Sequence, residues 1–161
     1  MGASFHWMER DEVLATLERM TVANGGVATL SGESVWRQRE FHDDQVTERT
    51  WSSVVRETVA EFFGPEHRAG TGTYRHPADR HEIVLARSAF NKVEKFSFLA
   101  RQELTTDEII GLQLSTSYAS PAQLGPRLDE FESALRTRLL QLNPSGVFDG
   151  ETTTELLIAT R

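Results

Sequence analysis

A helix and a strand that decide the fold lie in residues 9–34, which read ERDEVLATLERMTVANGGVATLSGES. Apolar residues recur at helical spacing over 9–20, with charged residues on the opposite face, so we predict an amphipathic helix there. Asn24-Gly25-Gly26 ends this helix and forms a tight turn. The apolar run 27–30 lacks in–out alternation, which predicts a strand buried on both faces, as in a parallel sheet. A helix that leads through a turn into a buried strand indicates α/β layering.

Later segments carry the periodicity of helices. We predict helices over residues 51–63, 79–87, 105–114 and 124–142. Gly64-Pro65 ends the first of these, and Asn143-Pro144 ends the last. Thr105 and Glu108 have the spacing of a capping box, in which the threonine side chain caps the helix and the glutamate bonds back to it.

The apolar stripes of these helices predict which side chains face a core. The expected inward residues are Trp51, Val54, Val55, Thr58, Val59 and Phe62; Ile83, Val84 and Ala86; Ile109, Ile110 and Leu112; and Leu128, Phe131, Leu135, Leu139 and Leu142. Residues 64–77, which contain Gly70, Gly72 and Pro77 between helices, are predicted to form a loop.

Two further strands are predicted at about 92–103 and at 152–160. Asp149-Gly150, just before the second of these, is typical of a hairpin turn. No repeat or linker divides the chain, and 161 residues fit one domain. Three strands are few for an α/β domain with this much helix, which indicates that part of the sheet is missing.

The composition narrows the classes of function. The net charge is −7 and the isoelectric point is near 5.2, so a nucleic-acid-binding surface is not expected. The absence of cysteine excludes disulfides, thiolate metal sites and cysteine nucleophiles. No apolar run approaches the roughly 18 residues of a membrane span, and the first residues do not read as a signal peptide. We therefore expect a cytoplasmic protein that binds neither nucleic acid nor membrane.

Metal and hydrolase sites are not expected. His76 and His81 are five residues apart with Pro77 between them, which does not place two ligands on one helix face. The G-x-S-x-G motif of serine hydrolases is absent.

The order of several short motifs resembles that of class I S-adenosylmethionine-dependent methyltransferases. Ser4-Phe5-His6-Trp7-Met8-Glu9-Arg10 precedes the first helix, the Gly25-Gly26 turn and the apolar strand. Downstream, residues 96–105 resemble the sixth strand of that family, 108–118 the segment after it, and 152–161 its closing seventh strand. The resemblance covers nearly the whole chain. It is closest to the small-molecule branch, which includes trans-aconitate and ubiquinone methyltransferases.

The resemblance implies part of a Rossmann-like sheet, in which 152–160 lies antiparallel between Gly26–Ser31 and 92–103. It also implies S-adenosylmethionine as the cofactor of the intact enzyme. However, no glycines here form the G-x-G-x-x-G loop between a strand and a helix that would cradle such a cofactor. We therefore expect residues 1–161 to form a single domain, the C-terminal portion of the fold without its N-terminal cofactor-binding half. Such a chain is expected to bind the cofactor weakly on its own.

The resemblance also assigns candidate site residues. The rim of the cofactor site would comprise Ser4, Phe5, His6 and Trp7, and the substrate side would comprise Trp36, Arg37, Arg39 and Tyr118. His6 could act as a catalytic base or orient a substrate hydroxyl, and an arginine could clamp a carboxylate. Each residue has a structural alternative: His6 and Trp7 pack a strand–helix junction, the arginines are solvated, and Tyr118 packs its loop.

The sequence leaves two hypotheses of function, from different classes. The first is the substrate-lid portion of a methyltransferase that acts on a small molecule. The second is a non-catalytic remnant that dimerises or binds a partner, such as the missing N-terminal half. The strand at 27–30 favours association, because it carries no lysine, proline or inward charge that would prevent pairing at its edge.

Overall fold

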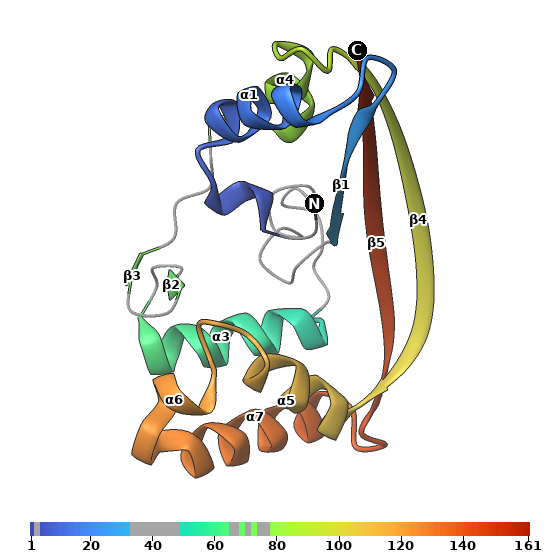
Figure 1. Cartoon of the computed structure of the whole chain (residues 1–161). Coiled ribbons are helices and arrows are strands. Elements are labelled where there is room, and N and C mark those ends of the chain that lie inside the picture. Colours follow the sequence, from blue (N-terminus) through green and yellow to red (C-terminus); the bar gives the residue numbers. More distant parts are fainter. Residues whose placement is uncertain (2–3, 33–48, 65–67, 70–71, 74–77) are drawn as a thin grey trace. The chain divides into compact units, whose positions relative to one another are not determined.

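A computed structural model describes residues 1, 4–32, 49–64, 68–69, 72–73 and 78–161 (Figure 1). The helices are η1 (Phe5–Trp7), α1 (Arg10–Met20), α3 (Trp51–Phe63), α4 (His81–Ala86), α5 (Thr106–Leu114), α6 (Pro121–Leu124), η2 (Gly125–Arg127) and α7 (Leu128–Leu142). The strands are β1 (Gly26–Gly32), β2 (Arg68–Ala69), β3 (Gly72–Thr73), β4 (Lys92–Thr105) and β5 (Val147–Thr160). In this described part of the chain, no helix is long and apolar enough to cross a membrane.

The contacts within the chain divide it into two compact units. The first unit consists of Met1–Glu33, His76–Ala100 and Thr152–Arg161, and the second of Ser34–Arg75 and Arg101–Glu151. Strands β4 and β5 contribute residues to both units. Whether these units fold as the single domain expected from the length stays a prediction.

A three-stranded open sheet with the order β1-β5-β4 forms the base of the first unit. β1 pairs antiparallel with β5 in a register that runs from Gly26↔Thr160 to Gly32↔Thr154. The prediction that the last strand lies between the other two, antiparallel to them, is therefore confirmed. The chain is of the α/β class, while membership of the Rossmann-like folds stays a prediction.

Strand β1 buries one face instead of the two that its apolar run predicts. Thr29 is buried, whereas Ala28 and Leu30 on either side of it are exposed. The prediction was wrong because, among the described residues, the helices α1 and α4 pack against only one face of the sheet. That face carries Val27 and Leu157, which lie in the same apolar cluster as residues of α1 and α4.

The core of the first unit consists of the buried residues Phe5, Leu14, Val84, Leu85, Phe90, Leu157 and Ala159. Helix α4 contributes Val84 and Leu85, while Ile83 and Ala86 are exposed, so the prediction that those two residues face inward was wrong. A helix of six residues makes fewer than two turns, and two adjacent residues are enough to fill its inward face.

Helices α3, α5 and α7 form the core of the second unit. Their predicted stripes are largely confirmed: Val54, Val55, Val59, Ile109, Ile110, Phe131, Leu135 and Leu139 are all buried in one cluster. α3 and α5 each begin with a capping box, formed by Thr50 with Ser53 and by Thr105 with Glu108. The second of these confirms the box predicted from the sequence.

One residue of α5 that was predicted to face the core, Leu112, faces solvent instead. Leu112 is 45% exposed, and Gln113 is buried in its place. Burial of this amide is tolerated because its Oε1 accepts a hydrogen bond from the Tyr118 hydroxyl at 2.9 Å, and its Nε2 lies 3.5 Å from the Ile109 carbonyl oxygen.

The helix predicted over 124–142 is interrupted near its start. α6 ends at Leu124, a 3-10 turn spans Gly125–Arg127, and α7 begins at Leu128. Gly125 adopts a positive φ of 53°, and the proline after it disfavours helical geometry at the residue before. The rest of the helix follows the prediction.

The turn predicted at Asp149-Gly150 was wrong, because both residues lie within β5. The chain instead turns at Asn143–Gly146, where Gly146 has a φ of 69° and its N–H donates to the Asn143 carbonyl at 3.0 Å. Gly150 is needed for packing: a Cβ there would lie 2.8 Å from Leu104 Cδ1. The predicted loop at 64–77 contains a two-stranded pairing of β2 with β3.

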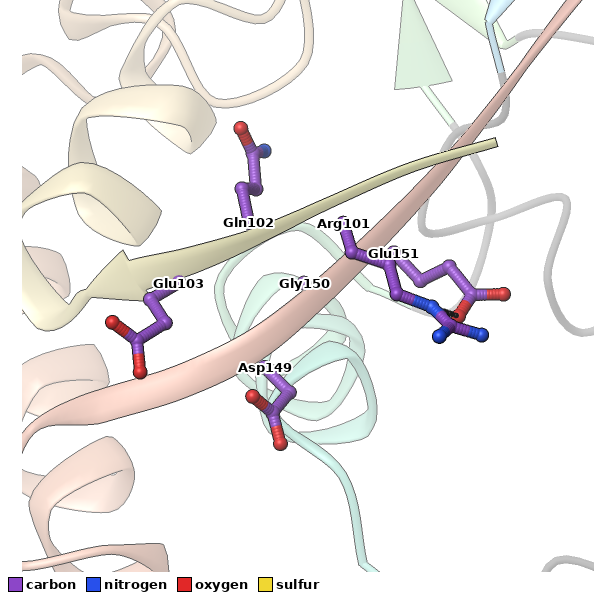
Figure 2. Close-up of a pocket in the computed structure, with 6 residues that line it drawn as sticks. All are labelled: Arg101, Gln102, Glu103, Asp149, Gly150 and Glu151. Carbon is purple, nitrogen blue, oxygen red and sulfur yellow. Dashed lines mark hydrogen bonds and ion pairs between the residues drawn. The ribbon is translucent and has the colours of Figure 1, made fainter. Parts of the chain in front are cut away.

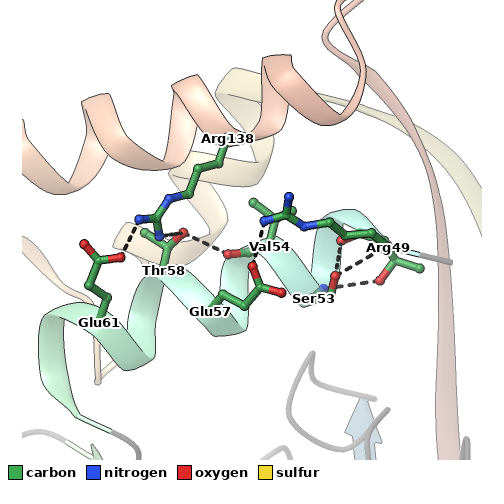
Figure 3. A network of polar contacts seen from close by, with 8 residues as sticks. Arg49, Ser53, Val54, Glu57, Thr58, Glu61 and Arg138 are labelled. Atoms are coloured by element: carbon green, nitrogen blue, oxygen red, sulfur yellow. Dashed lines mark hydrogen bonds and ion pairs between the residues drawn. The ribbon is translucent and has the colours of Figure 1, made fainter. Parts of the chain in front are cut away.

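A polar network on the surface joins α3 to α7 (Figure 3). Arg138 donates to the Thr58 hydroxyl at 3.0 Å and also pairs with Glu61. The Thr58 hydroxyl in turn donates to the Val54 carbonyl at 2.8 Å. Thr58 is fully buried, and its hydroxyl has a partner both as a donor, to Val54, and as an acceptor, from Arg138.

Candidate functional site

The short turn η1 holds the rim residues predicted from the sequence. Phe5 is buried in the core of the first unit, which fixes the turn, and the Trp7 N–H donates to the Ser4 carbonyl at 3.0 Å. The His6 and Trp7 rings lie side by side, with centroids 5.1 Å apart and an interplanar angle of 42°. Trp7 is 57% exposed. The turn therefore presents one indole and one imidazole at the surface of the first unit, while its first residue, Phe5, is anchored beneath.

Contacts between α1 and α4 support this turn. The Phe5 ring lies 5.1 Å from the His81 ring, and Arg10 Nη1 donates to the Asp79 carbonyl at 2.8 Å. The same nitrogen lies 3.3 Å from His81 Nδ1. Because a guanidinium can only donate, this geometry requires His81 Nδ1 to accept. The rim residues are thus supported by α1 and α4, and hydrogen bonds join these two helices to each other.

An exposed group of ion pairs also joins α1 to α4. Arg87 donates two hydrogen bonds to the Asp11 carboxylate, at 2.9 and 2.7 Å, and also pairs with Asp79. The hydrogen bond from Arg87 holds the pKa of Asp11 below its ordinary value, and the bonds to Asp11 and then Asp79 raise the pKa of Arg87. All three side chains are 40% exposed or more, so solvent screening limits their contribution to stability.

The remaining predicted residues fall into two groups. Trp36, Arg37 and Arg39 lie outside the described residues. Tyr118 lies in the second unit, where it is half-buried against the core and its hydroxyl donates to Gln113. This arrangement gives Tyr118 a structural role in its loop.

A hollow of about 560 Å³ in the second unit was not predicted (Figure 2). Its lining comes from adjacent stretches of two strands: Arg101, Gln102 and Glu103 of β4, and Asp149, Gly150 and Glu151 of β5. Arg101 Nε pairs with Glu151 at 3.1 Å, and the Trp51 indole donates to the Asp149 carbonyl at 3.0 Å. The lining therefore holds three carboxylates and one guanidinium, and these four side chains are all exposed.

No sequence signal marks this hollow. Arg101, Gln102 and Glu103 read as the polar end of a strand, and Asp149-Gly150 reads as a turn. Only the pairing of β4 with β5 brings the two stretches together. Among the described residues, no group of three or more His, Asp or Glu side chains is placed to hold a metal ion.

The conformations of the glycines bear on whether the described residues could hold a nucleotide cofactor. The glycines with positive φ are Gly64, Gly125 and Gly146, and in the described chain each follows a helix instead of joining a strand to a helix. The backbone cradle for a cofactor therefore has no counterpart in the described loops. What fits an adenine is the exposed ring of Trp7 beside His6, which could stack on a planar base.

Comparison with known proteins does not assign this chain to a family. No protein-family model matches the chain, and no curated protein matches it.

Proposed function

We propose that this chain is the C-terminal, substrate-lid portion of a class I S-adenosylmethionine-dependent methyltransferase that acts on a small molecule. The order of the sheet carries the proposal, because β5 lies antiparallel between β1 and β4 as the resemblance implies. A second point of support is the position of η1 directly before the α1–β1 unit, where that family has its aromatic turn.

In the proposed enzyme, the chain's own residues orient substrate and cofactor. Trp7 covers one face of the adenine, and His6 beside it orients or deprotonates the substrate nucleophile. Trp36, Arg37 and Arg39 contribute to the lid over the substrate, with an arginine pairing with an acidic group. The cofactor, when bound, supplies the methyl group on its sulfonium.

The rim can be tested by saturation-transfer NMR with S-adenosylhomocysteine and the 161-residue chain. We expect weak transfer to the adenine protons that is lost in Trp7→Ala and retained in Thr137→Ala, which changes an exposed side chain of α7. Equal transfer in Trp7→Ala and the wild type would argue against the proposed rim. Isothermal titration that gives low-micromolar affinity would contradict the proposal that this chain holds only part of the cofactor site.

A second candidate function is a partner-binding or dimerisation module, and the uncovered face of the sheet favours it. Leu30, Phe96, Phe98 and Ile158 are between 36% and 56% exposed, although all four belong to the three-stranded sheet. Apolar side chains that gather on one surface are typical of an interaction site.

Sedimentation velocity tests this second function. We expect the wild-type chain to self-associate at concentrations on the order of tens of micromolar, and Phe98→Thr to associate less. A single 18.1 kDa species for the wild type would contradict this function.

A further inference from the structure

The strand β4 lies at an edge of the described sheet, and the middle of this strand is uncharged. β4 is the last strand in the order β1-β5-β4, so within the described part of the chain only one side of its backbone is paired (Figure 1). Residues 96–100 carry no charge, and all five are exposed. Charged residues and prolines are the usual protection of an edge strand, and this stretch has neither. The middle of β4 is therefore open to pairing with another strand.

Charged residues of opposite sign lie on either side of this stretch. Lys95 precedes it, and Arg101 and Glu103 follow it. Because successive side chains of a strand point to opposite faces, Lys95, Leu99 and Glu103, spaced four residues apart, lie on the same face of β4. Leu99 is 54% exposed. The edge thus carries a lysine and a glutamate placed symmetrically about an exposed leucine.

This symmetry suits a second copy of the same chain. Two identical strands related by a two-fold axis perpendicular to the sheet pair antiparallel, and each contact between them occurs twice. With the axis at Leu99, Lys95 of each copy lies opposite Glu103 of the other. An axis at Phe98 would place Lys95 opposite Arg101, where like charges repel, and an axis at Ser97 would place Lys95 opposite Leu99, without an ion pair. Charge complementarity therefore favours the axis at Leu99.

We propose that β4 is a dimer interface, in which β4 of a second copy pairs antiparallel with it about a two-fold axis at Leu99. The Lys95 ammonium contacts Glu82 at 3.2 Å and Glu155 at 2.5 Å, and its three N–H groups allow a third carboxylate, that of Glu103 from the second copy. Among the described residues, no cation pairs with Glu103 within its own chain. The proposal rests on the second candidate function, for which it names the partner and the strand, and it is independent of methyl transfer.

A cysteine introduced into β4 reports the register, because the chain has no cysteine of its own. Residues directly opposite each other in an antiparallel pair have Cα atoms about 4.5–5.5 Å apart, a distance that a disulfide spans. We expect Leu99→Cys to form a covalent dimer under mild oxidation, measured on a non-reducing gel. Ser97→Cys, on the same face of the same strand, is the matched control: in this register its two cysteines lie about 13 Å or more apart. It should cross-link about tenfold more slowly.

A second variant, Glu103→Lys, tests the charges without altering the uncharged stretch. It would place two lysines opposite each other at both ends of the interface, so we expect the dimer Kd, from sedimentation velocity, to rise about tenfold. Glu12→Lys on α1 is the control, because Glu12 is exposed and the net charge changes equally. Its Kd should stay within about twofold of the wild type. Thermal unfolding followed by circular dichroism establishes that each variant is folded.

Three results would overturn the proposal. The first is a wild-type chain that sediments only as an 18.1 kDa monomer. The second is cross-linking of Ser97→Cys as fast as that of Leu99→Cys, and the third is an unchanged Kd in Glu103→Lys. Because a dimer persists in the last two results, they exclude this register and leave self-association through another surface standing. None of the readouts involves S-adenosylmethionine, so the methyltransferase proposal is tested separately.

Discussion

The two units of the molecule bury their apolar residues to very different extents. In the second unit, Phe131, Leu135 and Leu139 of α7 are completely buried against stripes of α3 and α5. In the first unit, α1 and α4 cover one face of a sheet, and Leu30 and Phe98 remain about half exposed. A helix buries one stripe and is satisfied by one neighbouring layer, whereas a sheet made of apolar strands has two faces to cover. The described apolar residues of the second unit are therefore more fully buried than those of the first.

The largest effect that would test this difference is Phe131→Ala. Phe131 is fully buried and its ring meets that of Phe62 edge-on, with centroids 5.2 Å apart. We expect the free energy of unfolding, from urea denaturation, to fall by about 3–5 kcal/mol. A loss below about 1 kcal/mol would show that the core of the second unit is less tightly packed than described.

The next effect tests how closely β1 approaches β5. A Cβ on Gly26 would lie 2.6 Å from the Ala159 carbonyl oxygen, while a Cβ on Gly32 meets nothing within 4 Å. We expect Gly26→Ala to lower the free energy of unfolding by about 1–3 kcal/mol, because backbone must shift to admit the methyl group. Gly32→Ala, in the same strand, is the matched control and should be close to neutral. Equal effects of the two substitutions would contradict the described register.

A smaller effect concerns the cap of α5 in the second unit. The Thr105 hydroxyl accepts from the Glu108 N–H at 3.2 Å, and the Glu108 carboxylate accepts from the Thr105 N–H at 2.8 Å. Thr105→Ala should lower the free energy of unfolding by about 1 kcal/mol at neutral pH. Thr106→Ala is less suitable as a control because Thr106 bonds to Gly146, so the exposed Thr137→Ala on α7 serves instead.

The same cap predicts a pH dependence. Hydrogen bonds from the Thr105 N–H and hydroxyl hold the pKa of Glu108 below its ordinary value of 4.5. A carboxylate with a lowered pKa stabilises the fold fully above the pKa of the unfolded chain, and that contribution is lost as pH falls through the folded pKa. The difference in stability between wild type and Glu108→Gln should therefore be constant above about pH 5.5 and shrink as the pH falls below 4.5. A difference that grows on acidification would contradict the hydrogen bonds described.

The smallest effect on stability is expected at Phe98 on the uncovered face. Because the side chain is 56% exposed, Phe98→Thr should change the free energy of unfolding by less than about 0.5 kcal/mol. Threonine is β-branched and, like the phenylalanine it replaces, is favoured in strands. A loss comparable to that of Phe131→Ala would mean that the two units do not differ in the way described.

The sequence predicted local structure well, since the signals for α3, α7 and the Thr105 cap lie within a few residues of each other. It failed where tertiary packing decides. The run at 27–30 does not alternate, so nothing in it shows that only one face is covered. Asp149-Gly150 has the composition of a turn, but both residues lie within β5, where the side chain of Leu104 from β4 fills the space beside Gly150.

The candidate site was also predicted in part: its local features followed from the sequence, and its tertiary contacts did not. The sequence located Ser4–Trp7 as a turn before a helix, and the structure adds that Phe5 is the anchor and Trp7 the exposed ring. The hollow lined by Arg101 and Glu151 could not be predicted, because its residues come from strands far apart in the chain. The hydroxyl of Tyr118 was predicted as a candidate substrate contact and not as the partner of a buried glutamine, because Gln113 was not among the residues predicted to face inward.

The register of β1 with β5 also sets the order in which the chain can fold as it is synthesised. Gly26 pairs with Thr160, so the first strand of the sheet to leave the ribosome has no neighbour from this sheet until β4 and β5 follow. Helices α5 and α7 of the second unit meet over a much shorter separation and can pack earlier, since local contacts form faster than distant ones. During that interval β1 has no partner strand from this sheet.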